Sequence, residues 1–336
     1  ILNKLLDEEQ PDALCVTFDR KAPTFRHLAY EGYKAQRKGM PDELASQMPL
    51  LKEVLAAMKI PMYELDGWEA DDLIGTISVK DAAAGWATVI VTGDKDSLQL
   101  VTDTTTVKLV STRMGRTTTK DMTPDAFREQ YGFDPIHIVD LKALMGDSSD
   151  NIPGVKGVGE KTAMALVQRY HSIDALYAAM PTPEMAPGTP AKPGVVKKLA
   201  EGEEMARMSY DLATIHTDAP IEFDPEQNLC READNDALYQ LFLDLEFAKL
   251  IGRYGLTAPQ GEKKSAGETF DGSCVSETVD SRDRMEELLD LWRERDWVSV
   301  LALPSLDVVC VAWEEPEGER RAALFFADQW NCHNDF

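Results

Sequence analysis

Several short segments of the chain follow the apolar and polar periods of strands and helices. The runs 13–18 and 86–92 are apolar and rich in β-branched or aromatic residues, which predicts two buried strands. The run 136–145 has helical spacing, and residues 69–72 open a further helix. Strands that alternate with helices along a chain predict an α/β core.

Acidic residues stand at the ends of these predicted elements. Asp94 and Asp96 follow the strand 86–92 with one residue between them. The whole set is Asp19, Glu69, Asp71, Asp72, Asp94, Asp96, Asp147 and Asp150. Because α/β folds build their sites at such ends, these like charges would meet and repel unless cations lie among them. An all-oxygen ligand set without paired His or Cys predicts hard cations, Mg²⁺ or Mn²⁺, rather than zinc.

Each acid taken singly has a structural alternative. An acid at the start of a helix, such as Glu69, can stabilise the helix dipole by roughly 0.3–1 kcal/mol. Asp94 and Asp96 could be ordinary turn residues. The four separate groups of acids along the chain nevertheless favour one shared metal site.

Composition limits the class of protein. The chain has 336 residues, of which 43% are hydrophobic, so it can bury more than one core. Its five cysteines are scattered, which predicts neither a disulfide framework nor a zinc site and favours a reducing cytoplasm. No apolar run reaches the roughly 18 residues of a membrane span, and no signal peptide is visible, so no membrane partner is expected.

The net charge of −24 argues against a nucleic-acid partner, but the distribution of charge argues for one. Residues 20–38 contain six basic residues and one acid. If this segment is one helix, a single face carries Arg26, Tyr30, Tyr33, Lys34 and Arg37. Cations interleaved with aromatic rings suit single-stranded nucleic acid, whereas a solvated basic helix is the alternative.

A glycine-rich turn, 154–159, precedes an amphipathic run that predicts a helix. Glu160 stands between the last glycine and Lys161, so a Walker A loop does not fit. Thr162 replaces the third glycine of a dinucleotide fingerprint. The turn therefore predicts contacts with the backbone of a duplex that do not depend on base sequence. A simple helix cap is the alternative.

These motifs together resemble the 5′-nuclease family, and most closely the amino-terminal 5′→3′ exonuclease domain of bacterial DNA polymerase I. The segments that carry the resemblance are 18–26, 30–37, 69–72, 92–96 and 146–157. They keep the order of the family and cover residues 1 to about 257.

The resemblance implies a PIN-like nuclease core over 1–150 and a helix-three-turn-helix region over 151–257. It implies two Mg²⁺ or Mn²⁺ ions and phosphodiester hydrolysis at 5′ ends, in replication and repair. Lys34, Arg26 and Arg37 would act on the scissile phosphate. The DNA-binding residues would be Tyr30, Tyr33, Lys156, Gly157, Gly159, Lys161 and Thr162, with Tyr33 stacked on a base and K⁺ near the glycine-rich turn.

Three departures from the family accompany the resemblance. The first family strand, with its Asp ligand, would lie upstream of Ile1. A proline-rich loop follows residue 180 and contains Pro181, Pro183, Pro187, Pro190 and Pro193. Residues 258–280 predict a linker, and 281–336 resemble the start of an RNase-H-like 3′→5′ exonuclease domain.

The predicted elements of that last domain are a helix, 281–295, and strands at 297–303 and 307–313. Leu301, Ala302 and Leu303 stand where an Asp-x-Glu metal pair is expected, so proofreading activity is predicted to be absent. This part of the chain is expected to serve as a scaffold.

Two other functions share part of this pattern of acids. A haloacid-dehalogenase phosphatase needs a second Asp two residues after the first, and Lys21 stands there after Asp19. The stronger alternative is an inactive flap- or duplex-binding fragment that lacks the first metal-ligand strand. The expected partners are DNA with a 5′ flap, nick or RNA-primer end, and a polymerase module in a longer chain. A monomer associated with the bacterial nucleoid is expected.

Overall fold

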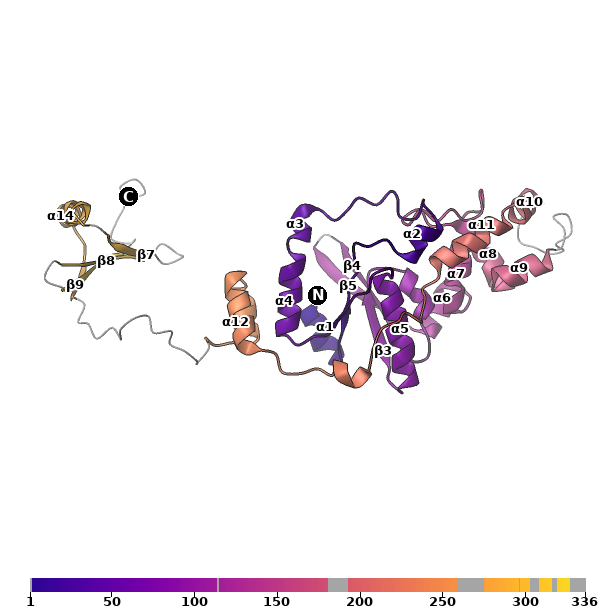
Figure 1. The fold of residues 1–336 in the computed structure, drawn as a ribbon, viewed down its shortest axis with the longest axis horizontal. Coiled ribbons are helices and arrows are strands. Elements are labelled where there is room, and N and C mark those ends of the chain that lie inside the picture. The colour runs from indigo at the N-terminus through magenta and orange to yellow at the C-terminus, as the bar shows by residue number, and fades with distance from the viewer. Residues whose placement is uncertain are drawn as a thin grey trace. The chain divides into compact units, whose positions relative to one another are not determined.

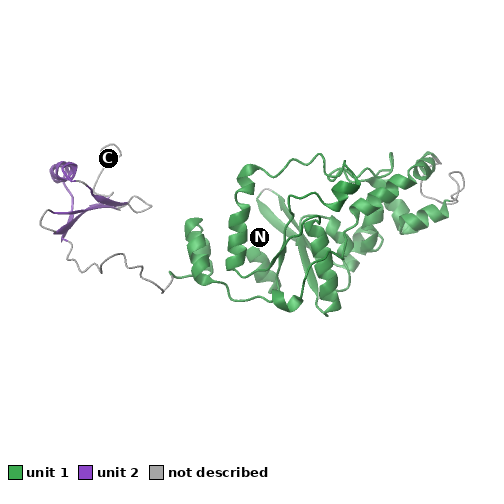
Figure 2. Cartoon of the chain, in the orientation of Figure 1, with its two compact units in different colours: residues 1–258 green, residues 259–336 purple. Residues whose placement is uncertain are grey.

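The computed structural model describes residues 2–113, 115–180, 193–258, 275–295, 297–302, 308–315 and 319–326. The chain forms two compact units, residues 1–258 and residues 259–336 (Figure 2). None of the helices within the described ranges is long and apolar enough to cross a membrane.

Unit 1 begins with a mixed part in which strands and helices alternate (Figure 1). Its elements are α1 (Leu2–Glu9), β1 (Val16–Thr17), α2 (Phe25–Ala29), α3 (Asp42–Ala45), α4 (Met48–Ala57), β2 (Met62–Tyr63), α5 (Ala70–Ala83), β3 (Thr88–Thr92), the 3₁₀ helix η1 (Asp96–Leu100), β4 (Thr105–Arg113) and β5 (Arg116–Met122). A helical part follows and completes the unit. It contains α6 (Pro124–Tyr131), η2 (Pro135–His137), α7 (Ile138–Met145), α8 (Glu160–Tyr170), α9 (Ile173–Ala179), α10 (Pro193–Glu201), α11 (Glu203–Ala213), η3 (Pro225–Asn228), α12 (Asn235–Asp244) and α13 (Ala248–Arg253).

The strands of unit 1 form two small sheets. β1 and β2 pair in parallel, and they are not hydrogen-bonded to the second sheet in the described part of the chain. In the second sheet β3 is parallel to β4, and β4 is antiparallel to β5. The register places Ile90 opposite Val107 and Val107 opposite Met122, and all three side chains are buried. This row of apolar side chains begins the main core.

One continuous hydrophobic core joins the second sheet to the helical part. Its members, taken along the chain, include Ile90, Val107, Phe127, Leu144, Leu166 and Leu199. Burial of such side chains stabilises the fold by roughly 1.5–3 kcal/mol each. Because the core is continuous, the strand ends and the glycine-rich turn before α8 belong to one packed body.

Local sequence signals explain where the helices of this core begin and end. The Thr123 hydroxyl accepts a hydrogen bond from the Ala126 backbone N–H and caps α6, which has Pro124 as its first residue. α6 ends at Gly132, where φ is +79°. A smaller cluster fixes α12 to α4, where Phe242 and Leu238 pack near Ala57.

Unit 2 is a four-stranded sheet with one helix. The elements are β6 (Val275–Thr278), α14 (Arg282–Arg293), β7 (Ser299–Ala302), β8 (Val308–Glu314) and β9 (Arg320–Phe326). The strand order is β6-β9-β8-β7, with β6 parallel to β9 and the other pairs antiparallel. Leu288 of α14 packs in a core that includes Trp313 and Phe325.

The predicted α/β core followed by a helical region is confirmed. β1, β3, α5, α7, α8 and α14 all lie within or close to the segments predicted for them. The predicted linker over 258–280 is wrong at its end, because 275–278 form β6. The strands β2, β4, β5, β6 and β9 were not predicted. Ile1, the prolines at 181, 183, 187 and 190, and residues 303 and 307 lie outside the described residues, whereas Pro193 begins α10.

The predicted single helix through residues 26–37 is also wrong. α2 ends at Ala29, Tyr30 has an extended backbone, and Lys34 has φ of +52°. Residues 31–36 form turns that are held by another turn, 149–151. The Lys34 N–H donates to the Asp150 carbonyl at 2.9 Å, and the Asn151 side chain donates to the Gly32 carbonyl at 2.6 Å. These tertiary hydrogen bonds outweigh the helical pattern.

Candidate functional site

The predicted acids lie at the ends of elements of unit 1, as the sequence indicated. Asp19 lies two residues after β1, and its carboxylate accepts a hydrogen bond from the Ala70 N–H, the first of α5, at 2.8 Å. Asp94 follows β3, and it accepts from the Asp96 N–H at 2.9 Å. Ordinary capping and turn bonds thus fix the places of these acids.

Asp71 lies where negative charge accumulates without a partner. Burial, together with Asp94, Asp96 and Asp19, raises the pKa of Asp71 to about 7. No hydrogen bond or ion pair joins Asp71 or Asp94 to a cation within the described ranges. Burial and Asp94 also raise the pKa of Asp96 to about 6, against the opposing effect of Lys142. Such a group of uncompensated carboxylates favours the binding of a divalent cation.

Lys34 and Arg37 neutralise a second part of the acid group. The Lys34 ammonium lies 2.8 Å from Glu69 and 3.7 Å from Asp150. Arg37, whose side chain is 49% exposed, pairs with the buried Asp150 carboxylate. Both cations therefore lie beside the acids and reach toward solvent, as a contact to a phosphate requires.

Arg26 and Asp72 form a third, fully buried part of the acid group. The guanidinium binds both carboxylate oxygens of Asp72, at 2.8 and 2.7 Å, and also donates to the Leu212 and Thr214 carbonyls. Asp72 further accepts from the backbone N–H of Glu69 and of His216. In this arrangement each group has its full set of hydrogen-bond partners, so the phosphate contact of Arg26 and the metal-ligand role of Asp72 stay predictions that the observed contacts do not support.

Tyr33 is likewise buried, with 3% of its surface exposed. Its hydroxyl donates to Glu69 at 3.1 Å, and burial and the Glu69 carboxylate raise its pKa, so the hydroxyl stays protonated. The buried position of Tyr33 gives no support to its stacking on a base, which stays a prediction. Tyr30 is half-buried and packs against the main core, and its predicted contact with DNA stays a prediction.

Lys142 of α7 is a residue of this site that the sequence did not indicate. Its ammonium donates to Asp147 at 2.6 Å and to Asp96. Burial alone would lower the pKa of Lys142, but these two carboxylates raise it. Burial would raise the pKa of Asp147, but hydrogen bonds from Lys142 and Ser149 lower it to about 2. The signal was a lysine in the last turn of a mostly apolar helix, five residues before Asp147.

The donor set fits a divalent cation, although its side chains are not arranged around one. Among the described residues, no three His, Cys, Asp or Glu side chains form a ready group of metal ligands. Ion pairs with Lys34, Arg37 and Lys142 hold Glu69, Asp150, Asp96 and Asp147. The remaining uncompensated acids are hard oxygen donors of the kind that Mg²⁺ and Mn²⁺ prefer.

The predicted glycine-rich turn precedes α8, and its residues Lys156, Gly157 and Gly159 are exposed, whereas Val155 and Val158 are buried. Gly157 has φ of +82°, a conformation that suits glycine, and Gly159 is the N-cap of α8. Lys156 and Lys161 are exposed, and Thr162 is half-buried. The start of α8 therefore offers backbone N–H groups and two ammonium groups to an anion.

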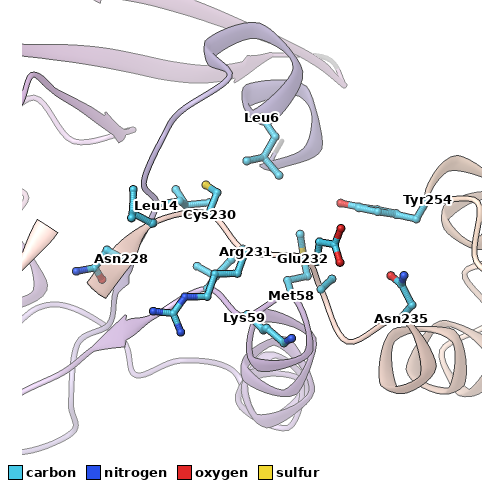
Figure 3. Close-up of a pocket in the computed structure, with 13 residues that line it drawn as sticks. Leu6, Leu14, Met58, Lys59, Asn228, Cys230, Arg231, Glu232, Asn235 and Tyr254 are labelled. Carbon is cyan, nitrogen blue, oxygen red and sulfur yellow. The ribbon is translucent and has the colours of Figure 1, made fainter. Parts of the chain in front are cut away.

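A pocket of about 400 Å³ lies elsewhere in unit 1 (Figure 3). Leu6, Met58, Arg231 and Tyr254 are among the side chains around it. None of the predicted site residues lines this pocket.

Comparison with known proteins gives consistent matches. The family model described as 5′-3′ exonuclease, N-terminal resolvase-like domain, matches residues 1–132. The model described as 5′-3′ exonuclease, C-terminal SAM fold, matches residues 133–236.

Curated relatives cover most of this chain. DNA polymerase I of Bacillus subtilis (strain 168) is 40% identical over 279 residues, which are 83% of this chain and 31% of that protein. The thermostable DNA polymerase I of Thermus aquaticus is 33% identical over 297 residues, 88% of this chain and 32% of that protein. This chain thus corresponds to less than a third of the length of either relative.

Solved structures share the fold. T5 5′-exonuclease with divalent metal ions (zinc) bound has a TM-score of 0.52 at 20% identity, over 73% of this chain and 88% of that chain. A bacteriophage T5 flap endonuclease in a complex with DNA and metal ions also has a TM-score of 0.52 at 20% identity, over 74% and 88%. At this identity the likeness supports the fold alone.

Replacing Arg26 by Met should destabilise the chain strongly. The change leaves the Asp72 carboxylate buried without its cation, which costs about 3–5 kcal/mol. Urea unfolding of the full chain measures the loss. Arg37→Met is the matched control and should cost less, because Arg37 is half-exposed and the Asp150 carboxylate keeps Lys34 as a cationic neighbour at 3.7 Å. Equal effects of the two changes would mean that Arg26 does not anchor the fold.

Replacing Asp71 by Asn should flatten the pH dependence of stability in metal-free buffer. Because the folded pKa of Asp71, about 7, exceeds the ordinary value of 3.8, the unfolded chain binds fewer protons between these values. Wild-type stability should therefore fall as pH rises through this window, and the variant should lose part of that slope. Thermal unfolding with a chelator measures it, with the exposed Asp125→Asn as control. An unchanged slope would contradict the charge assignment.

Proposed function

This chain belongs to the 5′-3′ exonuclease family, and from that premise we propose that it hydrolyses phosphodiester bonds at the 5′ ends and flaps of DNA. Its substrates would be the flaps, nicks and RNA-primer ends that arise in replication and repair. The observation that carries the proposal is the uncompensated charge around Asp71, which raises the pKa of this carboxyl to about 7. Carboxylates that repel one another at strand ends are stabilised when cations bind between them, so this arrangement suits a metal site.

Asp19, Asp71, Asp94 and Asp96 are the residues that would hold two Mg²⁺ or Mn²⁺ ions, with Glu69, Asp147 and Asp150 at the edge of the site. When bound, such ions supply Lewis-acid stabilisation of the reacting phosphate. The hydrogen bond from the Tyr33 hydroxyl orients the Glu69 carboxylate beside these acids.

Lys34 and Arg37 are the residues that would bind the scissile phosphate. Lys34 is partly exposed and Arg37 half-exposed, and both already lie against carboxylates of the site. Their positive charge would stabilise the negative charge that develops on the phosphate oxygens during hydrolysis. Arg26 stays with Asp72 and takes no part in this contact.

The turn before α8 would hold the downstream duplex. Lys156, Gly157, Gly159, Lys161 and Thr162 are the contacts we propose, and backbone carbonyls of this turn could also hold a K⁺ ion. Exposure of the two lysines and the position of Gly159 at the start of α8 support a phosphate contact. Tyr30 would contact the unpaired 5′ strand.

The division of the chain into domains and its cellular setting are also proposals. We divide the chain into the nuclease core 1–150, the helix-three-turn-helix region 151–257, a linker and an RNase-H-like start over 281–336. The antiparallel order β7-β8-β9 is compatible with the last assignment. Leu301 of β7 is 65% exposed and cannot ligate a metal, which supports a scaffold role. We also propose that the protein is a monomer and that a longer chain joins it to a polymerase module. Its location would be the bacterial cytoplasm, at the nucleoid.

Replacing both Asp94 and Asp96 by Asn should abolish cleavage of a labelled 5′-flap DNA in Mg²⁺. Duplex binding in Ca²⁺ should remain, because Lys34, Arg37 and the turn before α8 are unchanged. Asp125→Asn, on the exposed surface of α6, should cleave normally. Cleavage by the double variant would refute the metal assignment. A wild-type chain that binds the flap but never cleaves it would instead be a DNA-binding fragment.

Replacing Lys161 by Ala should weaken binding to all duplex sequences alike and lower the log–log salt slope by about one. Lys249→Ala is the control, since Lys249 is exposed on α13 and α13 packs on α12. A Cβ at Gly159 would meet no atom within 4 Å, so Gly159→Val should fold and yet bind duplex poorly. Fluorescence anisotropy across a salt series measures both. Equal losses on single-stranded and duplex DNA would contradict a duplex anchor.

A further inference from the structure

The pairing of Lys142 with two carboxylates separates these two acids from the unpaired acids of the site. The Lys142 side chain is 9% exposed, and its ammonium contacts Asp96 and Asp147, which come from separate segments of the chain. Asp71 and Asp94, by contrast, form no hydrogen bond or ion pair with a cation in the described part of the chain, although the charge of Asp94 acts on Arg37. The Asp96 and Asp147 part of the site therefore has a paired ammonium, and the part around Asp71 and Asp94 has no paired cation.

The position of this ammonium is fixed by the fold. α7 is buried over most of its length, and Lys142 lies between the buried residues Leu141 and Ala143. The second oxygen of Asp147 accepts from the Ser149 N–H at 2.8 Å and from the Ser149 hydroxyl at 2.5 Å. A short, buried and oriented contact of this kind is not a mobile surface pair.

We propose that Lys142 acts as a built-in cation that occupies the place between Asp96 and Asp147 and competes there with a divalent ion. The half around Asp71 and Asp94 binds a divalent ion without this competition. The two ions of the site therefore differ in affinity, and the ion on the Lys142 side is the weaker one. This inference rests on the proposed function, since it takes the acids to be metal ligands.

A comparison within the chain separates competition from a simple contribution to stability. Lys108 of β4 is also 9% exposed and also contacts two carboxylates, Glu9 at 3.0 Å and Asp121. Neither of these acids belongs to the predicted site. Lys108→Met should therefore destabilise the fold without any effect on cation binding at the acids.

The test counts bound Mn²⁺ on the full chain by electron paramagnetic resonance of the free ion. Wild type should bind one ion more tightly than a second. Lys142→Met should bind the second ion at least about tenfold more tightly, because a unit charge a few ångströms away no longer opposes it. Lys142→Gln, which keeps a hydrogen-bond donor without the charge, should do the same. Lys142→Arg should bind like wild type, as should Lys108→Met.

Thermal unfolding gives a second readout that does not depend on cleavage. Without divalent ions Lys142→Met and Lys142→Gln should unfold at lower temperature than wild type, and Mn²⁺ should raise their midpoint by more. If both variants are folded and bind the second ion no more tightly than wild type, Lys142 is not a competitor and the inference is overturned. If wild type and all variants bind no Mn²⁺, the proposed metal site itself fails.

Discussion

The buried ion pair between Arg26 and Asp72 holds the acid site to the rest of unit 1. It joins the start of α5 to the end of α11 and the chain that follows, because Arg26 also donates to the Leu212 carbonyl at 3.1 Å and Asp72 accepts from the His216 N–H. A buried pair of this kind adds little net stability but strongly disfavours arrangements that separate its members. Asp71, the next residue, is thereby held among the other acids despite the repulsion.

Charge compensation in the site is uneven, and the unevenness carries chemical information. Lys34 lies against Glu69 and Lys142 lies against Asp147, so both acids take part in ordinary ion pairs. Asp71 receives no such compensation and keeps a proton more readily than a normal aspartate. A purely structural cluster would gain stability from a paired cation at every acid. The missing compensation at Asp71 is what distinguishes a binding site from a surface network.

The sequence predicted the positions of the acids better than their partners. Asp94 after β3 and Asp19 after β1 follow from strand periodicity, which is a local property. The burial of Arg26 and Tyr33 was not predicted, because it depends on residues far away in the chain, such as Leu212 for Arg26. Lys142 was missed because a lysine in an apolar helix usually extends to solvent, whereas this one meets two carboxylates.

Helix periodicity failed over 26–37 for a related reason. The pattern of basic and aromatic residues is compatible with a helix, but Lys34 has a left-handed backbone that is fixed by the Asp150 carbonyl. The turns nevertheless bring Lys34 to Glu69, so the functional prediction for this lysine does not depend on the helix. A local pattern can thus identify the residues of a surface and misjudge the backbone that presents them.

The core shared by the sheet and the helical part has a consequence for where the chain acts on a long substrate. Ile90 and Phe127 lie in the segment of one family model, Leu144 and Leu166 lie in that of the other, and all four pack in one cluster. Parts that share a core do not hinge against each other. The distance from the turn before α8 to the acids is then constant. In the proposed function, this constant distance would set how many base pairs separate the held backbone from the bond that is cut.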